Sequence, residues 1–335
     1  MSDHPPRGAR ATIVCFGEAL IDLLAREPPE APAPRQFTEY AGGAPANVAV
    51  AVARLGGRAR FIGMLGEDLF GDRLLAQLQR GGVDVACVRR TPEAKTALAF
   101  VSLDARGERS FSFYRPPAAD LLFRETHFEP RCFEDAAVFH VCSNSLTEPA
   151  IAAATLGGMR RARAAGALLS VDLNLRTSLW PRTVDPVPQL WETLLEADLI
   201  KLCRGELQFL APSAGGVEAA LQRMLQARAQ CVLLTDGPAP VRWFTRTSSG
   251  SVPAFSVRVV DTTAAGDALV GGWLKSLTDR GAGRETLGAF LRERAQLGEC
   301  LRYAVACGAL ATTRHGAFAA MPAEEEVRAL QQARP

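Results

Sequence analysis

The stretch VVDTTAAGDALVGGWL, Val259–Leu274, joins two different hydrophobic patterns. The residues Phe255–Val260 alternate in polarity and are rich in β-branched and aromatic side chains, which predicts a β-strand. From Asp267 onward the apolar residues follow a helical period. The small residues between them, Thr262–Gly266, therefore predict a tight turn that opens a helix, where unpaired backbone N–H groups and the helix dipole bind anions.

Asp267 stands in the first turn of this expected helix. A carboxylate beside a phosphate cradle suits a general base that deprotonates an acceptor hydroxyl while the cradle holds the transferring phosphoryl group. The structural alternative is an ordinary helix start, with Asp261 as N-cap and Asp267 pairing with the dipole. The chemical interpretation is favoured because the turn has no bulky residue. In addition, Gly271 and Gly272 each cost about 1 kcal/mol in a helix interior unless another element packs closely there.

The pattern Asp-Thr-Thr-Ala-Ala-Gly-Asp at 261–267 resembles the C-terminal signature of the ribokinase-like family of carbohydrate kinases, which usually has glycine where Ala264 stands. The resemblance implies that Asp267 is the catalytic base and that ATP and Mg²⁺ are the cofactors. It also implies an anion hole made by the backbone of Ala264, Ala265, Gly266 and Asp267. Alanine is expected to be tolerated at 264 because main-chain donors form the hole, as long as its φ stays negative.

A second helix is predicted to start at a glycine pair, Gly42–Gly43. Pro45 suits a first helical turn, and the glycines Gly56–Gly57 end the apolar face. Asn47 fits a backbone that approaches a polar ligand, although the glycine pair also fits a plain turn. This stretch is similar to the family's N-terminal signature, Gly-Gly-x-x-x-Asn-x-Ala. The resemblance implies that Gly42, Gly43 and Asn47 contact the sugar.

Polar residues follow two predicted strands, at the place where open α/β sheets bind ligands. Asp22 comes after the apolar run Thr12–Phe16, and a solvated turn carboxylate is the alternative. The run Asp172–Arg176 ends another strand and resembles the family's Asp-x-Asn-x-Arg sequence. The resemblance implies that Asp22 contacts the acceptor hydroxyls and that Arg176 contacts sugar or phosphate.

Two alternating strands, Ala97–Leu103 and Arg109–Tyr114, predict a hairpin that interrupts the βα rhythm. An isolated hairpin is unstable, so it needs another strand, and the segment Gln36–Tyr40 is the expected partner. Arg115 at its end is a candidate contact for the acceptor, with a solvated arginine as the alternative.

The resemblance implies that the segments 17–41 and 96–116 form a small β lid over the site. It further implies nucleotide and metal contacts. Glu206 matches the glutamate of the family's Asn-x-x-Glu motif, which positions magnesium through water, whereas Cys203 replaces the asparagine. The nucleotide contacts implied are Thr235, Gly237 and Cys307. A monovalent cation, K⁺, is implied beside Asp261, Thr263, Ala311, Arg314 and Gly316.

The length, composition and net charge of the chain limit the size of its core and the kinds of partner it binds. The chain has 335 residues and 48% hydrophobic content, enough for a sizeable core. Its 38 basic and 36 acidic residues leave a net charge of +2, so the expected partners are a small sugar and ATP, with no nucleic acid and no membrane. Residues 1–10 are expected to be disordered and 11–335 to form one domain, which is expected to make a homodimer through the lid.

The eight cysteines are scattered without a CxxC pair or a Cys/His cluster, which predicts buried free thiols in a reducing compartment. The N-terminus has no apolar signal core, and no run approaches the ~18 apolar residues of a membrane span. These features predict a cytoplasmic protein.

The strand–helix–strand order from Ala136 to Arg176 predicts parallel pairing. The expected fold is therefore a three-layer α/β/α core with a mainly parallel, ribokinase-like sheet and a small β lid. The resemblance implies an ATP-dependent sugar kinase, most similar to the fructokinases that convert D-fructose to fructose 6-phosphate. A 2-keto-3-deoxygluconate or nucleoside kinase shares every motif, and a sugar-binding protein with impaired catalysis is the alternative from another class.

Overall fold

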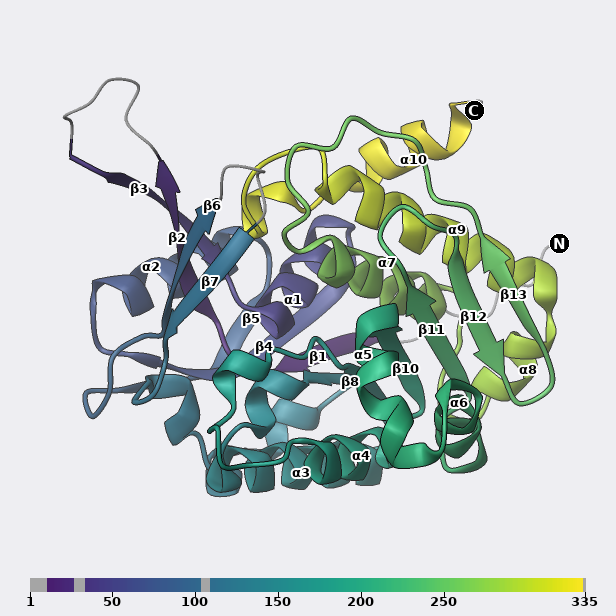
Figure 1. The fold of residues 1–335 in the computed structure, drawn as a ribbon, viewed down its shortest axis with the longest axis horizontal. Coiled ribbons are helices and arrows are strands. Elements are labelled where there is room, and N and C mark those ends of the chain that lie inside the picture. The colour runs from purple at the N-terminus through teal and green to yellow at the C-terminus, as the bar shows by residue number, and fades with distance from the viewer. Residues whose placement is uncertain (1–10, 27–33, 104–108, 334–335) are drawn as a thin grey trace, which may run out of the picture.

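The computed structural model describes residues 11–26, 34–103 and 109–333. The expected disorder of residues 1–10 and the expected turn at 104–107 lie outside the described residues. Within them the strands form a nine-stranded sheet and a separate four-stranded sheet, as Figure 1 shows.

The described strands are β1 (Thr12–Phe16), β2 (Leu20–Arg26), β3 (Gln36–Gly42), β4 (Arg58–Gly66), β5 (Asp84–Thr91), β6 (Leu98–Leu103), β7 (Arg109–Tyr114), β8 (Ala136–Cys142), β9 (Leu168–Asp172), β10 (Leu199–Cys203), β11 (Cys231–Thr235), β12 (Val241–Thr245) and β13 (Ser249–Val252). The described α-helices are α1 (Ala44–Arg54), α2 (Leu69–Arg80), α3 (Pro149–Ala164), α4 (Val187–Glu196), α5 (Arg204–Leu210), α6 (Val217–Gln226), α7 (Ala265–Asp279), α8 (Leu287–Arg292), α9 (Arg294–Ala311) and α10 (Glu324–Gln332).

The large sheet has the strand order β13-β12-β11-β10-β9-β8-β1-β4-β5. Its pairs are parallel from β5 to β11, and β12 and β13 add an antiparallel edge. The central strand β1, with the sequence TIVCF, is buried at every position, as expected for a parallel strand covered on both faces. The expected mainly parallel sheet is therefore confirmed.

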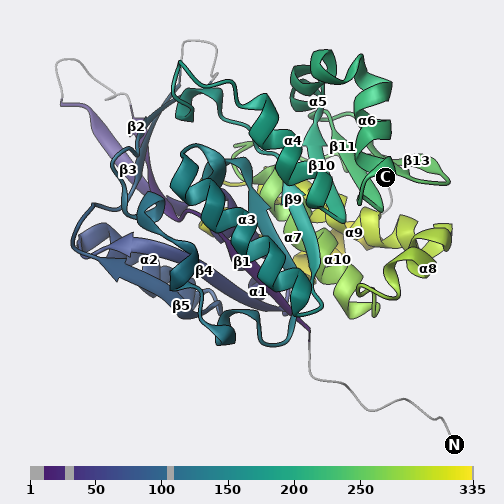
Figure 2. The ribbon, with the colours of Figure 1, turned by 90° about the horizontal axis from the view of Figure 1, so that it is seen from below.

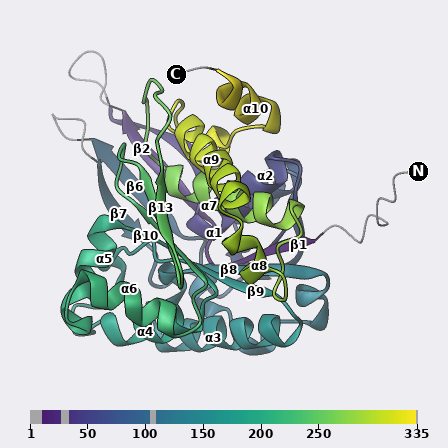
Figure 3. The same cartoon turned by 90° about the vertical axis from the view of Figure 1, so that its right-hand side faces the viewer.

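Helices cover both faces of this sheet (Figures 2 and 3). The helices α3, α4, α5 and α6 lie on one face, and α1, α2, α7, α8, α9 and α10 lie on the other. Each face has its own hydrophobic core, one packed around Trp273 of α7 and the other around Phe139 of β8. This is the three-layer α/β/α arrangement that the sequence predicts.

Two glycines let three helices of one layer approach closely. A Cβ atom at Gly271 would lie 2.6 Å from Cβ of Ala51 in α1, and one at Gly272 would lie 2.6 Å from Sγ of Cys307 in α9. Both are closer than side chains tolerate, so the expected close packing at this glycine pair is confirmed. The contact with α1 brings the start of that helix beside the start of α7, although the two are far apart in sequence.

The small sheet has the order β3-β2-β6-β7. The predicted hairpin is present as β6 and β7, but its partner is β2, so the expected pairing with Gln36–Tyr40 is wrong. β2 lies between the hairpin and β3, pairing parallel with β6 and antiparallel with β3. The burial of the two strands agrees with this order, because Leu20, Ile21 and Leu24 of β2 are buried, whereas β3 at the edge is buried only at Ala41 and Gly42.

The strand predicted at Phe255–Val260 is also wrong. The sheet edge is taken by β13 (Ser249–Val252), and the later residues form no strand. The backbone N–H groups of Val260 and Asp261 instead donate to the carbonyl of Thr312, at 2.8 and 3.0 Å. These bonds hold the segment against the end of α9, and Val259 is 59% exposed.

Candidate active site

A cavity of about 400 Å³ opens where several strands of the large sheet end. Its walls come from the starts of α1 and α7, from the loops after β8, β9 and β10, and from the small sheet. The carboxyl edge of an open parallel sheet is the usual ligand position in such folds. The lining residues are Glu18, Leu20, Asp22, Gly43, Ala44, Asn47, Phe113, Asn144, Asn174, Arg176, Lys201, Cys203, Glu206, Thr262, Thr263, Ala264, Gly266 and Asp267.

The first turn of α7 forms one wall of this cavity. The helix begins at Ala265, after a turn in which the Asp261 carboxylate accepts the N–H of Thr263 at 2.7 Å. The N–H of Ala265 makes a long bond to the carbonyl of Thr262 at 3.4 Å, and the N–H of Ala268 bonds back to the carbonyl of Ala264 at 2.9 Å. The N–H groups of Gly266 and Asp267 between them, together with the positive end of the helix dipole, are the donors that can stabilise an anion here.

Ala264 adopts a left-handed conformation, with φ 58° and ψ 11°. The expectation that its φ stays negative is therefore wrong. The left-handed region brings Cβ close to the following carbonyl and costs roughly 1–2 kcal/mol for any residue except glycine. Ala264 takes up this conformation where the chain turns into α7, so its backbone is strained.

We expect Ala264→Gly to raise the free energy of unfolding by about 1 kcal/mol, because glycine removes this strain. Turnover should change by less than about tenfold, since the main-chain donors stay in place. Urea unfolding and a kinase assay measure the two effects. The matched control is Ala265→Gly at the first position of α7, where glycine relieves no left-handed strain and should lower the free energy of unfolding. A less stable Ala264→Gly protein would contradict the strain.

Asp267 lies in the first turn of α7 and is 8% exposed. Burial raises the pKa of its carboxyl to about 7, and the negative charge of Asp172 acts in the same direction. A hydrogen bond from Nδ2 of Asn47 at 2.7 Å and the charge of Lys201 oppose this rise. A carboxyl group that titrates near neutral pH is well matched to proton abstraction.

The glycine pair before α1 is required by close packing. A Cβ atom at Gly42 would lie 2.5 Å from Oδ2 of Asp22, and one at Gly43 would lie 2.5 Å from the carbonyl oxygen of Glu18. Gly43 also has φ 104°, which disfavours any side chain. The pair thus lets the start of α1 lie directly against Asp22, Glu18 and the cavity, and Asn47 follows one turn later.

A buried ion pair stands behind Gly266. Nζ of Lys201 lies 2.9 and 3.0 Å from the two carboxylate oxygens of Asp172, and both side chains are almost fully buried. Burial alone would lower the pKa of Lys201, but the charges of Asp172 and Glu206 raise it above its usual value. A Cβ atom at Gly266 would lie 2.9 Å from this Nζ, so the glycine makes room for the ammonium group.

Sequence reasoning missed Lys201, Glu18 and Asn144, which line the cavity, whereas Asn174 in the same wall belongs to the run 172–176 that was recognised. Lys201 is the only charged residue within its otherwise apolar strand β10, LIKLC, and that contrast was an available signal. Glu18 is the second residue after β1, and a carboxylate placed just after a buried strand was the other available signal. Asn144 carries no such pattern, since polar residues are ordinary in loops.

Glu206 has a structural role at the start of α5. Its Oε2 accepts the N–H of Cys203 at 2.6 Å, and its Oε1 accepts the N–H of Leu175 at 2.8 Å. The side chain thus caps the helix and ties it to the loop after β9, where Asn174 and Arg176 line the cavity. No group of three or more His, Cys, Asp or Glu side chains suited to holding a metal occurs in the described part of the chain.

Arg115 is placed behind the cavity. It is 1% exposed and pairs with Asp120 at 2.6 Å, so a solvated arginine is wrong. Arg115 does not line the cavity, because its guanidinium is held in this buried pair. Cys307 is also buried, packed against Gly272, and does not line the cavity.

The remaining predicted residues lie around the cavity. Thr235 ends β11 in register with Cys203, which lines the wall, and Gly237 follows in the turn with φ 53°. Asp261, Thr263 and Gly316 line a second cavity of about 20 Å³, room for about one water-sized particle. Of the cation residues expected with them, Ala311 is buried in α9 and Arg314 pairs with Glu326.

Comparison with known proteins adds an independent observation. The family model described as "pfkB family carbohydrate kinase" matches residues 10–324. The chain is 42% identical to a probable fructokinase-4 of Arabidopsis thaliana, over 96% of this chain and 97% of that protein.

Solved structures give the same result. A fructokinase of Xylella fastidiosa with bound ATP is 53% identical, with a TM-score of 0.92 over 96% of this chain and 98% of that one. A fructokinase of Vibrio cholerae in a form with fructose, ADP and calcium is 30% identical, with a TM-score of 0.81 over 96% and 98% of the two chains.

Proposed function

Because the chain belongs to the pfkB family of carbohydrate kinases, we propose that it is an ATP-dependent fructokinase, which converts D-fructose to fructose 6-phosphate. The observation that supports this best is the buried carboxyl of Asp267, with a pKa of about 7, at the N-terminal turn of α7. The proteins compared above support the choice of sugar, since each is a fructokinase and one structure holds fructose and ADP.

In the proposed reaction, Asp267 accepts the proton of the acceptor hydroxyl. The hydroxyl oxygen forms a bond to the γ-phosphorus of ATP, and the bond from that phosphorus to the bridging oxygen breaks, so that ADP leaves with the electron pair. The backbone of Ala264, Ala265, Gly266 and Asp267 forms the anion hole that stabilises the transferring group. Proton abstraction is favoured because the carboxyl is poised close to neutral pH.

The proposed acceptor half of the cavity comprises Asp22, Gly42, Gly43 and Asn47, and Arg176 of the cavity wall is a further proposed contact. Gly42 and Gly43 keep the start of α1 against Asp22, as their close contacts show. The proposed nucleotide half extends past Cys203 towards Thr235 and Gly237. Arg115 is held in buried hydrogen bonds and Cys307 packs against Gly272, so neither is proposed as a ligand contact.

Magnesium fits this site as an ion that arrives with ATP. The two oxygens of Glu206 already accept backbone N–H groups, and the described residues offer no cluster of metal ligands, so the protein contact is proposed to run through water. Mg²⁺ commonly binds in this way, to substrate phosphates with few direct carboxylates. When bound, it would neutralise charge on the phosphates.

A monovalent cation, K⁺, is proposed for the small cavity at Asp261, Thr263 and Gly316. The hydroxyl of Thr263 is buried there without a hydrogen-bond partner among the described residues, so an acceptor is left for a cation. Ala311 and Arg314 are left out of this proposal because their side chains lie elsewhere.

The small sheet is proposed to be the lid of a single kinase domain, made from the segments 17–41 and 96–116. A homodimer through this lid is proposed as well, because Tyr114 and Phe37 of the small sheet are 68% and 44% exposed. No described helix is long and apolar enough to cross a membrane. Cytoplasmic location is proposed because all eight cysteines are free thiols.

A panel of acceptors tests the sugar. We expect kcat/KM for D-fructose to exceed that for 2-keto-3-deoxygluconate or a ribonucleoside by at least about tenfold, which equals 1.4 kcal/mol of transition-state binding. The measurement is ADP release with ATP and Mg²⁺. Preference for another acceptor would replace fructose within the same family. No turnover with any acceptor, together with sugar binding, would favour a catalytically impaired sugar-binding protein.

A further inference from the structure

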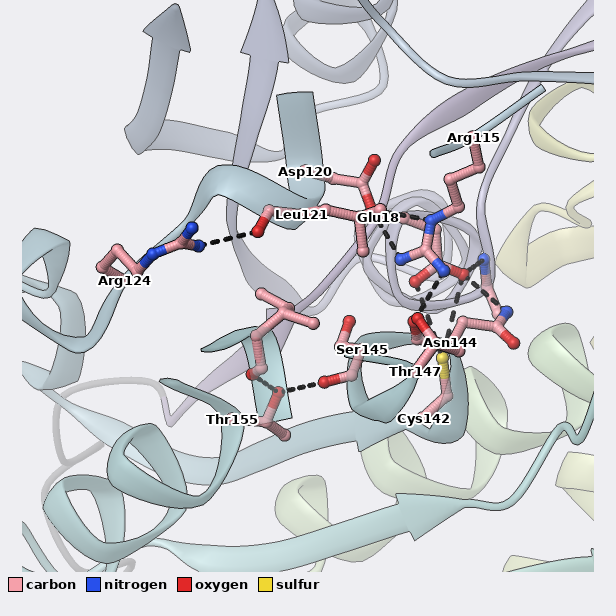
Figure 4. A network of polar contacts seen from close by, with 12 residues as sticks. Glu18, Arg115, Asp120, Leu121, Arg124, Cys142, Asn144, Ser145, Thr147 and Thr155 are labelled. Carbon is pink, nitrogen blue, oxygen red and sulfur yellow. Dashed lines mark hydrogen bonds and ion pairs between the residues drawn. The ribbon is translucent and has the colours of Figure 1, made fainter. Parts of the chain in front are cut away.

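Asn144 lines the cavity. Figure 4 shows it between Glu18 and Arg115, which hold it from two directions. Its side-chain Nδ2 donates to Oε1 of Glu18 at 2.9 Å. Its main-chain carbonyl accepts from Nη1 of Arg115 at 2.7 Å, and Arg115 is fixed in turn by Asp120. Arg115 directly follows β7, so the root of the small sheet is bonded to the same loop.

The bond to Glu18 decides which way the Asn144 amide points. A carboxyl oxygen that accepts must face the NH₂ group of the amide, so Oδ1 becomes the end that is left for other partners. This Oδ1 is buried and has no hydrogen-bond partner among the residues that the structure describes. Asn47 has the same arrangement, with its Nδ2 on Asp267 and its Oδ1 without a described partner.

The same Glu18 oxygen also holds the start of α1. Oε1 accepts the N–H of Ala44 at 3.2 Å, and that residue lies between Gly43 and Asn47. Both bonds therefore converge on one oxygen atom. The thiol of Cys142 makes weak contacts to both oxygens, with Sγ 3.8 Å from Oε1 and 3.7 Å from Oε2. Holding both groups therefore requires a single acceptor oxygen at the Oε1 position.

We propose that Glu18 is a positioning residue for sugar binding, which orients the Asn144 amide so that Oδ1 accepts a sugar hydroxyl and which fixes the start of α1. The inference rests on the proposed function, because it assumes an acceptor with several hydroxyl groups. The role assigned to Glu18 acts through its neighbours, because the residue is 1% exposed and its Oε1 already accepts from Ala44 and Asn144.

Two substitutions separate orientation from packing. Glu18→Gln keeps an oxygen at the Oε1 position, so both bonds can be retained. Glu18→Met has a similar length and no acceptor, so the Asn144 amide is free to rotate and the Ala44 N–H loses its partner. We expect Glu18→Met to raise the KM for D-fructose by about tenfold or more, the effect of losing a hydrogen bond to a buried group.

The expected signature is a difference between the two substrates. For Glu18→Met, the KM for ATP and kcat should change by less than about threefold, and Glu18→Gln should recover most of the D-fructose affinity. The control is Asp198→Asn. Asp198 is another largely buried carboxylate that accepts a backbone N–H, from Leu169 at 2.8 Å, but at the amino end of β9. This control should lower the melting temperature without changing the KM for D-fructose.

The outcomes are distinguishable. A wild-type protein that does not use D-fructose contradicts the proposed function and this inference together. If the wild type uses D-fructose, an unchanged D-fructose KM in Glu18→Met contradicts the inference alone. Equal increases in the KM of both substrates, or a Glu18→Gln protein as impaired as Glu18→Met, also contradict it, because packing or charge would then explain the effect.

Discussion

Asp267→Asn should lower kcat by about 10²–10⁴, the usual cost of removing a general base. Asparagine keeps the size of the side chain and an oxygen that can accept from Asn47, so the position of α1 should be preserved. The D-fructose KM should therefore change much less than kcat. The measurement is ADP release at saturating D-fructose and ATP, with a thermal melt of both proteins. A folded variant with near wild-type turnover would remove Asp267 from the mechanism.

The pH dependence of the wild type follows from the same group. The ionised form is the base, so kcat/KM of the wild type should rise with pH through a midpoint near 7. Asp267→Asn should lack this limb in its residual activity.

The contribution of Asp267 to the free energy of unfolding should fall as pH rises, whereas kcat/KM rises. The folded pKa is about 7, above the unfolded value of 3.8, so the stability that protonated Asp267 contributes is fully present below pH about 4. It is lost as pH rises through about 7. Relative to the wild type, Asp267→Asn should therefore be more stable at pH 8 than at pH 4. The same relative melting temperature at both pH values would contradict the raised pKa.

Lys201→Met should be the most destabilising of these substitutions. It leaves the Asp172 carboxylate buried without its partner, and breaking a buried ion pair typically costs about 3–5 kcal/mol. The charge of Asp172 would also act on Asp267 without the opposing charge of Lys201, so the pKa of Asp267 should rise further. Urea unfolding measures the first effect, and the acid limb of kcat/KM measures the second.

The double substitution Lys201→Met/Asp172→Leu separates folding from chemistry. Replacing both partners of a buried ion pair by apolar residues is often neutral, so the double variant should recover most of the lost stability. Both variants should turn over more slowly than the wild type, because the positive charge beside Gly266 is missing from the cavity wall in each. Recovery of both properties would show that the pair has only a structural role. An unchanged melting temperature in Lys201→Met would contradict its burial.

The amino-acid sequence by itself determined the class of fold and the two helix starts that flank the site. Hydrophobic periodicity depends only on local geometry, so the turn 261–267, the glycine pair before α1 and the alternating strands and helices could be recognised directly. The Gly271–Gly272 pair also predicted that another element packs closely against this helix. Each of these features is a pattern within one short run of adjacent residues.

Only the tertiary structure decided which residues meet. It placed β2 between β3 and the hairpin, buried Arg115 against Asp120, and set Lys201 behind Gly266. It also showed the left-handed Ala264 and joined Asn47 to Asp267 across 220 positions of sequence. None of these follows from a local pattern, because strand order, burial and the partner of a charged group depend on segments that pack together from distant parts of the chain.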